Sequence, residues 1–204
     1  MQTQADVSLA ARVADFESEW SGRSEQELVD TARRGDEQAF REIVRRLEGR
    51  VAATVIGMLG PGPEADDVGQ EAFVRLYRAL PKFRGDSTLA SYVTRIAINL
   101  CRNEWQRRKR RSDIFVRDES SQSENVPGPA GDAESLPERD LVRRALLQLS
   151  SEYREVIVLR LMDGFSTREA AGILDVPEGT LTSRLARGQM KLRAILEPML
   201  KEAS

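Results

Sequence analysis

The 204-residue sequence contains no histidine and only one cysteine, Cys101. Without histidine, the common zinc sites and catalysis by a histidine base are excluded, and a single cysteine cannot form an internal disulfide. No apolar run approaches the roughly 20 residues that a transmembrane helix needs, and the N-terminus lacks the basic-then-apolar order of a secretory signal. We therefore expect a cytoplasmic protein that does not insert into a membrane.

Hydrophobic residues make up 40% of the chain and charged residues 31%, which is typical of a soluble globular protein. The net charge of −2 argues against a protein that coats nucleic acid through bulk positive charge. The charges are nevertheless uneven, because a basic run at residues 107–111 is followed by an acidic segment. One hypothesis is that the basic run binds DNA weakly in the free chain and better once a partner rearranges the acidic segment.

No alternating apolar and polar run is long enough to predict a strand, so we predict an all-α fold. Serine, proline and glycine with little periodicity mark residues 112–137 as a flexible acidic linker. It joins two small helical domains, residues 24–111 and 138–204. Residues 1–23 form an N-terminal extension, in which we expect an amphipathic helix that docks onto the next domain. Each domain has a modest core, and we expect the two to move independently unless a partner fixes them.

Short-range signals set the expected helix boundaries. Ser24 and Glu27 form a capping box, and Gly35-Asp36 ends that helix and caps the next. A long helix, capped by Asp86 or Ser87, continues into the basic run. The expected helices run from Ser24 to Gly35, Asp36 to about Gly57, Ala65 to Ala79, residue 87 into the basic run, Glu138 to Leu149 and Ser151 to Met162. Glycine and proline at residues 60–63 are expected to stop a helix, and residues 81–86 to form a loop.

Residues 165–192 indicate two short helices joined by a tight turn. Ser166 and Glu169 cap the first, residues 175–177 break it, and the second begins at about Glu178 with arginines on its polar side. In a helix-turn-helix, this second helix enters the major groove of DNA. Small residues in the first helix permit close crossing, which favours this interpretation over an ordinary helical hairpin with solvated arginines.

Several short motifs occur in a fixed order on both sides of the linker. In the first half they are 27–29 (ELV), 34–40 (RGDEQAF), 65–73 (ADDVGQEAF) with Tyr77, 83–87 (FRGDS) and 95–99 (RIAIN). In the second half they are Leu149, 154–160 (REVIVLR), 164–166 (GFS), 169–171 (EAA) and 179–185 (GTLTSRL). Through these motifs the chain resembles bacterial RNA polymerase sigma factors of the extracytoplasmic-function group, in particular the sigma-E-like branch, over about residues 25–200.

The resemblance implies that residues 24–111 bind the minus-ten promoter element and the clamp helices of the polymerase's largest subunit. Residues 138–204 would read the minus-thirty-five element and meet the polymerase flap. Sigma factors are not enzymes, and the resemblance implies no cofactor, metal or small-molecule substrate. The implied partners are core RNA polymerase, promoter DNA and an anti-sigma factor that buries the DNA-binding domains.

An acidic strip on the expected helix at 65–79 is the candidate polymerase-binding site. Its members are Asp66, Asp67, Gln70 and Glu71. Taken alone, such a strip is usually a solvated helix face, and a metal-binding carboxylate cluster is a further interpretation. Neither histidine nor a second acidic helix supports the metal site. The resemblance instead implies docking against arginines of the polymerase. Gly69 departs from the aliphatic residue usual in the family.

The candidate minus-ten site comprises Phe83, Arg84, Asp86, Ser87, Asn99, Arg107, Arg108 and Arg110. Holding an unstacked base requires apolar walls and a few hydrogen-bonding groups, which the loop at 83–88 and Asn99 can supply. Phe83 has the alternative role of filling the core of its own domain. The arginines are candidate phosphate contacts, and their charge also suits the C-terminal end of a helix.

The candidate minus-thirty-five site comprises Thr180, Thr182, Ser183, Arg184 and Arg187. Arg187 is the strongest candidate for a base contact, because arginine can form two hydrogen bonds with guanine. Arg184 can bind phosphate or pair with Glu155. Thr182 replaces the lysine or arginine common in the family, so we expect the shape of a stiff A-rich tract to contribute more to recognition.

Two other functions are compatible with parts of the sequence. A stand-alone helix-turn-helix regulator would explain the second half and would bind a palindromic site as a dimer. A metal-dependent nuclease is the third class, and the absence of histidine argues against it.

Overall fold

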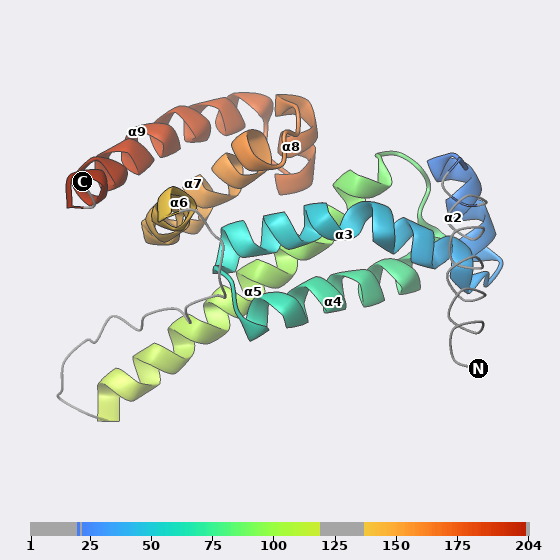
Figure 1. The fold of residues 1–204 in the computed structure, drawn as a ribbon, viewed down its shortest axis with the longest axis horizontal. Helices are drawn as coiled ribbons and strands as arrows, with labels where there is room; N and C mark the ends of the chain where they lie inside the picture. The colour runs from blue at the N-terminus through green and yellow to red at the C-terminus, as the bar shows by residue number, and fades with distance from the viewer. Residues whose placement is uncertain (1–19, 21, 119–136, 203–204) are drawn as a thin grey trace, which may run out of the picture.

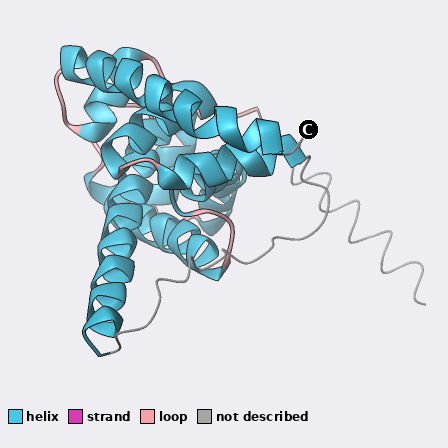
Figure 2. Cartoon of the chain, turned by 90° about the vertical axis from the view of Figure 1, so that its left-hand side faces the viewer, coloured by secondary structure: helices cyan, strands magenta, loops and turns pink. Residues whose placement is uncertain are grey.

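The computed structural model describes residues 20, 22–118 and 137–202. Within these ranges every regular element is helical, as Figure 2 shows, and the all-α prediction is confirmed. None of the helices described there is long and apolar enough to cross a membrane. The expected helix in the N-terminal extension lies outside the described residues, apart from residues 20, 22 and 23.

The first half contains a helical bundle in which α3 and α5 are flanked by α4 and α2 (Figure 1). Its elements are α2 (Glu25–Arg33), α3 (Glu37–Leu59), α4 (Pro63–Ala79), the 3-10 turn η1 (Leu80–Lys82) and α5 (Leu89–Asp118). The predicted capping box of Ser24 and Glu27 is present, and Asp36 caps α3. Helix α4 begins two residues earlier than expected, because Pro63 suits the first position of a helix.

The predicted cap of α5 is wrong. Its cap is Thr88 rather than Asp86 or Ser87, since the Thr88 Oγ1 accepts a hydrogen bond from the Ser91 backbone N–H at 3.1 Å. The helix also continues to Asp118, several residues into the expected linker at 112–137. The remaining linker residues, 119–136, lie outside the described ranges.

The second half contains α6 (Pro137–Gln148), α7 (Ser151–Ile157), the π-helical turn η2 (Val158–Met162), α8 (Thr167–Leu174) and α9 (Glu178–Glu202). Ser166 and Glu169 form the predicted capping box of α8. Asp175 ends α8 in the left-handed conformation with φ of 56°, which aspartate tolerates better than most residues. The helix-turn-helix therefore has the predicted boundaries.

Of the N-terminal extension the structure describes residues 20, 22 and 23, and Trp20 is buried against the first half. Arg46 on α3 donates to the Trp20 carbonyl at 2.9 Å, and the Arg23 guanidinium lies 3.9 Å above the indole ring. Arg46 is itself held by the buried carboxylate of Glu42 at 2.6 Å. Hydrogen bonds from Arg45 and Arg46 lower the pKa of Glu42 to about 2, so this anchor is charged at neutral pH.

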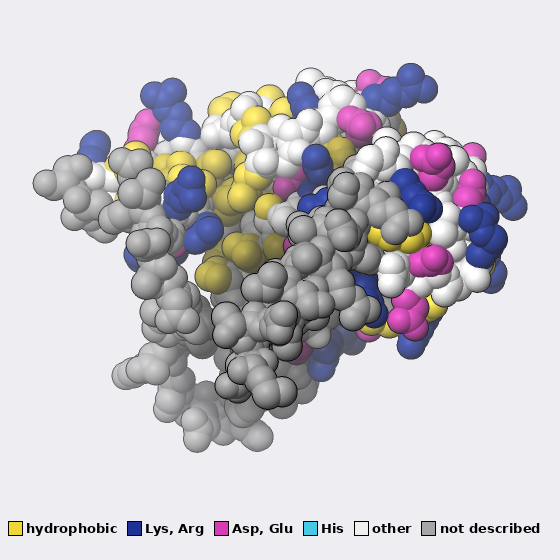
Figure 3. All heavy atoms as spheres, turned by 45° about the vertical axis from the view of Figure 1, so that its right-hand side comes forward, with side chains coloured by type: hydrophobic (Ala, Val, Ile, Leu, Met, Phe, Trp, Pro, Cys, Tyr) yellow, Lys and Arg dark blue, Asp and Glu magenta, His cyan; other side chains and the backbone are white. Residues whose placement is uncertain are grey.

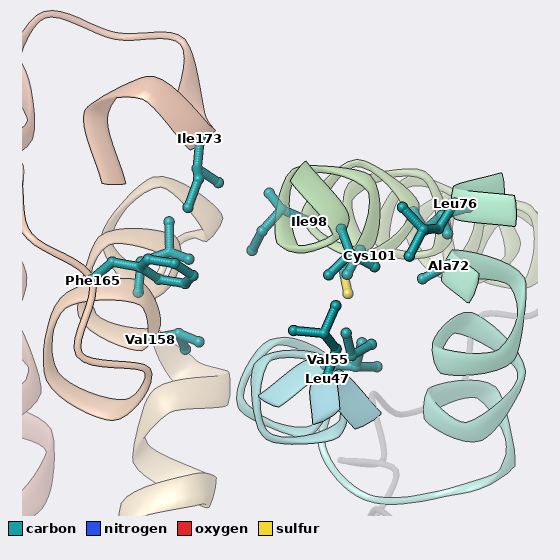
Figure 4. Packing of buried hydrophobic residues seen from close by; sticks show 14 of the residues in the cluster. Leu47, Val55, Ala72, Leu76, Ile98, Cys101, Val158, Phe165 and Ile173 are labelled. Carbon is teal, nitrogen blue, oxygen red and sulfur yellow. The ribbon is translucent and has the colours of Figure 1, made fainter. Parts of the chain in front are cut away.

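The two halves pack against each other, contrary to the expectation that they move independently. Figure 4 shows Val158, Phe165 and Ile173 of the second half facing Ile98 and Val55 of the first. Helix α9 does not cover this apolar side of the second half, so α3 and α5 bury it instead. Helical periodicity reveals an apolar face but not which neighbour covers it, which is why the sequence did not predict this packing.

Candidate nucleic-acid interface

Helix α4 presents the predicted acidic strip to solvent. Asp66, Asp67 and Gln70 are exposed, while Val68, Ala72 and Leu76 are buried beneath them. Glu71 is partly buried and pairs with Arg75 at 2.8 Å. A Cβ on Gly69 would meet no atom within 4 Å, so this surface is open to the close approach of a partner. The strip therefore has the exposure that a docking surface requires.

A hollow of about 470 Å³ lies between α4 and α5, next to the acidic strip. It is lined by Glu64, Asp67, Val68, Glu71, Arg75, Leu100, Asn103, Glu104 and Arg107. Sequence reasoning missed Glu64 and Glu104 as members of this surface. The signal for Glu104 was its spacing of three and four residues from Arg107 and Arg108, with which it pairs at 3.2 and 3.7 Å.

Phe83 holds the predicted minus-ten loop against the first half. Its ring is buried and lies edge-on to Tyr92 with 5.1 Å between centroids, while Arg33 donates to the Phe83 carbonyl. The following residues, including Arg84, Asp86 and Ser87, are exposed. This placement supports the packing role for Phe83 and leaves the polar loop residues available for contact.

Asn99 is exposed on α5 between two arginines that reach across to the second half. Arg95 donates to the Gly172 carbonyl, and Arg102 pairs with Glu155. Since these three α5 residues are spaced four and three apart, they share one side of the helix. The Arg102 Nη1 also lies 3.4 Å from the Asn99 Oδ1. Asn99 therefore lies on the side of α5 that faces the edge of the second half.

Bonds within the first half partly engage the predicted phosphate-binding arginines. Arg107 pairs with Glu104, and Arg108 donates to the Leu59 carbonyl at 3.3 Å and lies 3.6 Å from Glu64. Arg110 is exposed and bonds only weakly to the carbonyl of the preceding turn, at 3.3 Å. On the face shown in Figure 3, acidic and basic side chains alternate over the first half, and apolar side chains gather over the second.

The start of α9 carries the predicted base-reading residues. Thr182, Ser183 and Arg187 are exposed, Thr180 is partly exposed, and the buried Leu181 fixes the helix from beneath. Arg184 pairs with Glu152 at 3.6 Å. The alternative that Arg184 pairs with Glu155 is wrong, because α7 turns Glu155 inward toward Arg102 and leaves Glu152 near α9.

Helices α7 and α9 cross closely at Gly188, a contact that sequence reasoning missed. A Cβ there would lie 3.1 Å from the Ile157 Cδ1 and 3.3 Å from the Tyr153 Cβ. At the other end of the motif, hydrogen bonds from the Ser166 side chain and backbone lower the pKa of Glu169, which keeps the start of α8 capped. These contacts set the angle at which α9 is presented.

Both halves match known protein families. The sequence model described as Sigma-70 region 2 matches residues 43–111, and the one described as Sigma-70, region 4 matches residues 139–192. The RNA polymerase sigma-H factor of Pseudomonas aeruginosa is 34% identical over 188 residues, which is 88% of this chain and 97% of that protein. The ECF RNA polymerase sigma-E factor of Escherichia coli K12 is 34% identical over 186 residues, 87% of this chain and 97% of the relative.

Two solved structures share the arrangement of helices. CnrH, solved in complex with the cytosolic domain of CnrY, has a TM-score of 0.65 and 28% identity, covering 85% of this chain and 97% of that one. The sigma factor RpoE of Bartonella quintana, solved with the anti-sigma factor NepR, has a TM-score of 0.61 and 26% identity. The match covers 78% of this chain and 96% of that one. The chain therefore belongs to the extracytoplasmic-function sigma factors, alternative sigma factors that act in promoter-specific transcription initiation.

Proposed function

We propose that this sigma factor binds core RNA polymerase through α4, holds the minus-ten element with the loop after η1 and with α5, and reads the minus-thirty-five element with α9. The observation that supports this assignment best is the exposed polar row at the start of α9, presented by a capped α8 and a buried Leu181. The functional units proposed are residues 24–111 and 138–204, with the first extended by the α5 helix to Asp118.

The polymerase contact is proposed for Asp66, Asp67, Gln70 and Glu71. Their carboxylates and the Gln70 amide, together with the exposed Glu64 in the adjacent hollow, offer polar partners to the arginines of a clamp helix. Because the strip lies on a rigid helix whose other side is buried, it needs no rearrangement before docking. The polymerase flap is the proposed partner of the second half.

For the minus-ten element, the proposed contacts are Arg84, Asp86, Ser87 and Asn99, with Phe83 supporting the loop from within the core. Arg110 is the most accessible of the three candidate arginines for phosphate, whereas Arg107 and Arg108 must first leave their carboxylate partners. For the minus-thirty-five element, Arg187 is the proposed base contact, and Thr180, Thr182, Ser183 and Arg184 assist it.

We infer an anti-sigma factor as a further partner, because the similar sigma factor RpoE was solved in complex with the anti-sigma factor NepR, and CnrH in complex with the cytosolic domain of CnrY. The chain is proposed to act in the cytoplasm as an initiation factor rather than as an enzyme, with no cofactor or metal. Among the described residues, no three His, Cys, Asp or Glu side chains gather as they would around a metal ion.

The proposed function is tested by adding the purified chain to core RNA polymerase and sequencing the transcripts made from genomic DNA fragments. We expect start sites that share two upstream elements, and their loss in the variant Asp67→Lys/Glu71→Lys. The exposed control Glu48→Lys, on the neighbouring helix α3, should retain them. Tight binding to a palindromic site without polymerase would favour the dimeric regulator, and transcripts without a common start would contradict the proposal.

A further inference from the structure

Helix α7 packs against α9 and contacts two of its cations (Figure 1). The Arg184 Nη2 lies 3.6 Å from the Glu152 Oε2. The Lys191 Nζ lies 4.9 Å from the centroid of the Tyr153 ring. An ion pair and a cation–π contact both attract a positive charge, so each competes with any other anion that approaches the same side chain. Two adjacent residues of α7 therefore act on two cations that are about two turns apart on α9.

Arg187 differs from the other cations in this part of α9. Residues 178–195, all of which the structure describes, contain Arg184, Arg187, Lys191 and Arg193. Arg193 pairs with Glu197 at 2.9 Å, and the contacts of Arg184 and Lys191 are those with α7. Within the described chain, Arg187 is exposed and makes no hydrogen bond, ion pair or ring contact. The recognition helix thus offers one cation that no other side chain engages.

Helix α7 is a fixed support for these contacts. Its other side is buried, because Arg154 and Glu155 are only 1% and 2% exposed. On the side that faces α9, the backbones cross so closely that a Cβ on Gly188 would lie 3.3 Å from the Tyr153 Cβ. Glu152 and Tyr153 therefore keep their places when α9 meets DNA, and the cations of α9 must leave them in order to reach a phosphate.

Phosphate contacts and base contacts respond differently to the loss of such partners. A cation that neutralises a phosphate strengthens binding to every sequence alike and steepens the dependence of log K on log salt by about 0.9 on duplex DNA. A base contact changes the preference for one sequence over another. Glu152 is 47% exposed, and an exposed ion pair shifts a binding equilibrium by up to about fivefold. Its effect on DNA binding is therefore small but measurable.

We propose that Glu152 and Tyr153 are positioning residues that hold Arg184 and Lys191 away from DNA phosphates and so limit the sequence-independent part of the DNA affinity of α9. Arg187, which they do not contact, then supplies the sequence-dependent part. This inference rests on the proposed function of α9 in binding the minus-thirty-five element. A merely structural role of the two residues has another consequence, because a tilted α9 would lose its preference between sequences.

The test measures binding of the full chain to two short duplexes of equal length. One carries the upstream element recovered by the start-site sequencing, and the other carries the same bases shuffled. Fluorescence anisotropy between about 50 and 200 mM salt gives the Kd and the salt slope for each duplex. We expect Glu152→Gln to bind both duplexes about two- to fivefold more tightly at low salt, with a slope steeper by about 0.9 and an unchanged ratio of the two Kd values.

Two further variants frame this result. Tyr153→Leu keeps the Cβ that contacts Gly188 but removes the ring beneath Lys191, so it should change both duplexes in the same direction. The matched control is Glu37→Gln, which removes an exposed first-turn carboxylate that pairs with Arg41 at 3.5 Å on α3. It makes the same change in net charge and should bind both duplexes as the wild type does.

A double variant shows whether Glu152 acts through Arg184. In the Arg184→Gln background, Glu152→Gln should have little effect, and a full effect there would overturn the proposal, since Glu152 would then repel DNA by itself. An unchanged slope in Glu152→Gln would also overturn it, and a reduced preference between the duplexes would assign Glu152 a structural role. A wild type that does not distinguish the duplexes, with Arg187→Ala binding both equally well, would instead remove the proposed function of α9.

Discussion

Arg102 on α5 and Glu155 on α7 form a two-point ion pair between the halves, with Nε–Oε1 and Nη2–Oε2 distances both of 2.7 Å. The Glu155 side chain is only 3% exposed, whereas that of Arg102 is 36% exposed. The hydrogen bonds that Arg102 donates to Glu155 raise the pKa of Arg102. The carboxylate is therefore buried, and Arg102 is the cation that bonds to it directly, which makes the pair asymmetric.

Because of this asymmetry, we expect substitutions of Arg102 and Glu155 to have non-additive effects on the free energy of unfolding. Arg102→Gln should lower the free energy of unfolding by about 1 to 3 kcal/mol, because it leaves a buried carboxylate without its cation. The double variant Arg102→Gln/Glu155→Gln should lose less than the sum of the single variants, since two neutral amides can share the buried space. Urea unfolding of the four proteins measures the coupling, and additive effects would show that the pair contributes nothing.

Arg154 on α7 donates hydrogen bonds to backbone carbonyls at the ends of other helices. It is almost fully buried and donates to the carbonyls of Leu146, Leu147 and Leu149 at 2.6 to 2.9 Å, in addition to that of Met58. Burial lowers its pKa to about 10, so the guanidinium remains charged at neutral pH. A planar guanidinium with five donors can satisfy carbonyls from two helices at once, which an ammonium on a flexible stem cannot.

We therefore expect Arg154→Lys to cost about 2 to 4 kcal/mol of stability, although the charge is kept. Thermal or urea unfolding measures this loss, with the exposed Arg144→Lys on α6 as the matched control. Equal stability of the two variants would mean that the carbonyls at the helix ends find other donors.

Features that depend on neighbouring residues could be predicted from the sequence. The capping boxes of Ser24 and Ser166 each join residues three apart, so the pattern and the structure coincide. The exposed strip on α4 and the polar start of α9 likewise follow from helical spacing. These features define most of the candidate site.

Features that depend on distant residues could not be predicted from the sequence. Arg102 and Glu155 are 53 positions apart, and nothing in either segment indicates the other. The same holds for Thr54 and Asp163, which are 109 positions apart. For Phe83 the sequence left two roles open, and its burial beside Tyr92 favours the packing role. A basic residue in a helical pattern is expected to face solvent, so Arg154 carried no signal of its burial.

The exposed start of α9 predicts a specific role for Arg187. Arg187→Ala should reduce the preference for the cognate minus-thirty-five element over a mutated one by about 1 to 3 kcal/mol, the value of a two-bond arginine–guanine contact. Arg193→Ala is the control, because six residues along a helix place it about 240° away on another side. Fluorescence anisotropy with both duplexes measures the preference, and equal weakening on both would assign Arg187 to phosphate.

The buried carboxyl of Asp163, at the contact between the two halves, predicts that the free energy of unfolding depends on pH. Burial raises the pKa of this carboxyl from 3.8 to about 6, against the opposing effects of the Thr54 hydrogen bond and the Arg50 charge, and its Oδ1 has no hydrogen-bond partner. The native state thus binds more protons than the unfolded state between about pH 4 and pH 6. The contribution of Asp163 to the free energy of unfolding therefore falls as pH rises through this window and stays low above pH 6.

Asp163→Asn keeps an oxygen for the Thr54 hydroxyl but cannot ionise, so it should remove this fall. At pH 7 to 8 the variant should be about 2 to 3 kcal/mol more stable than the wild type, and near pH 4 the difference should vanish. Comparing the two proteins at each pH isolates Asp163, because carboxylates such as Glu42, whose lowered pKa gives the opposite slope, contribute equally to both. Asp86→Asn, in the exposed loop, keeps Asp163 and should reproduce the wild-type curve. A constant difference between Asp163→Asn and the wild type from pH 4 to pH 8 would show that the Asp163 carboxyl is not desolvated by the contact between the halves.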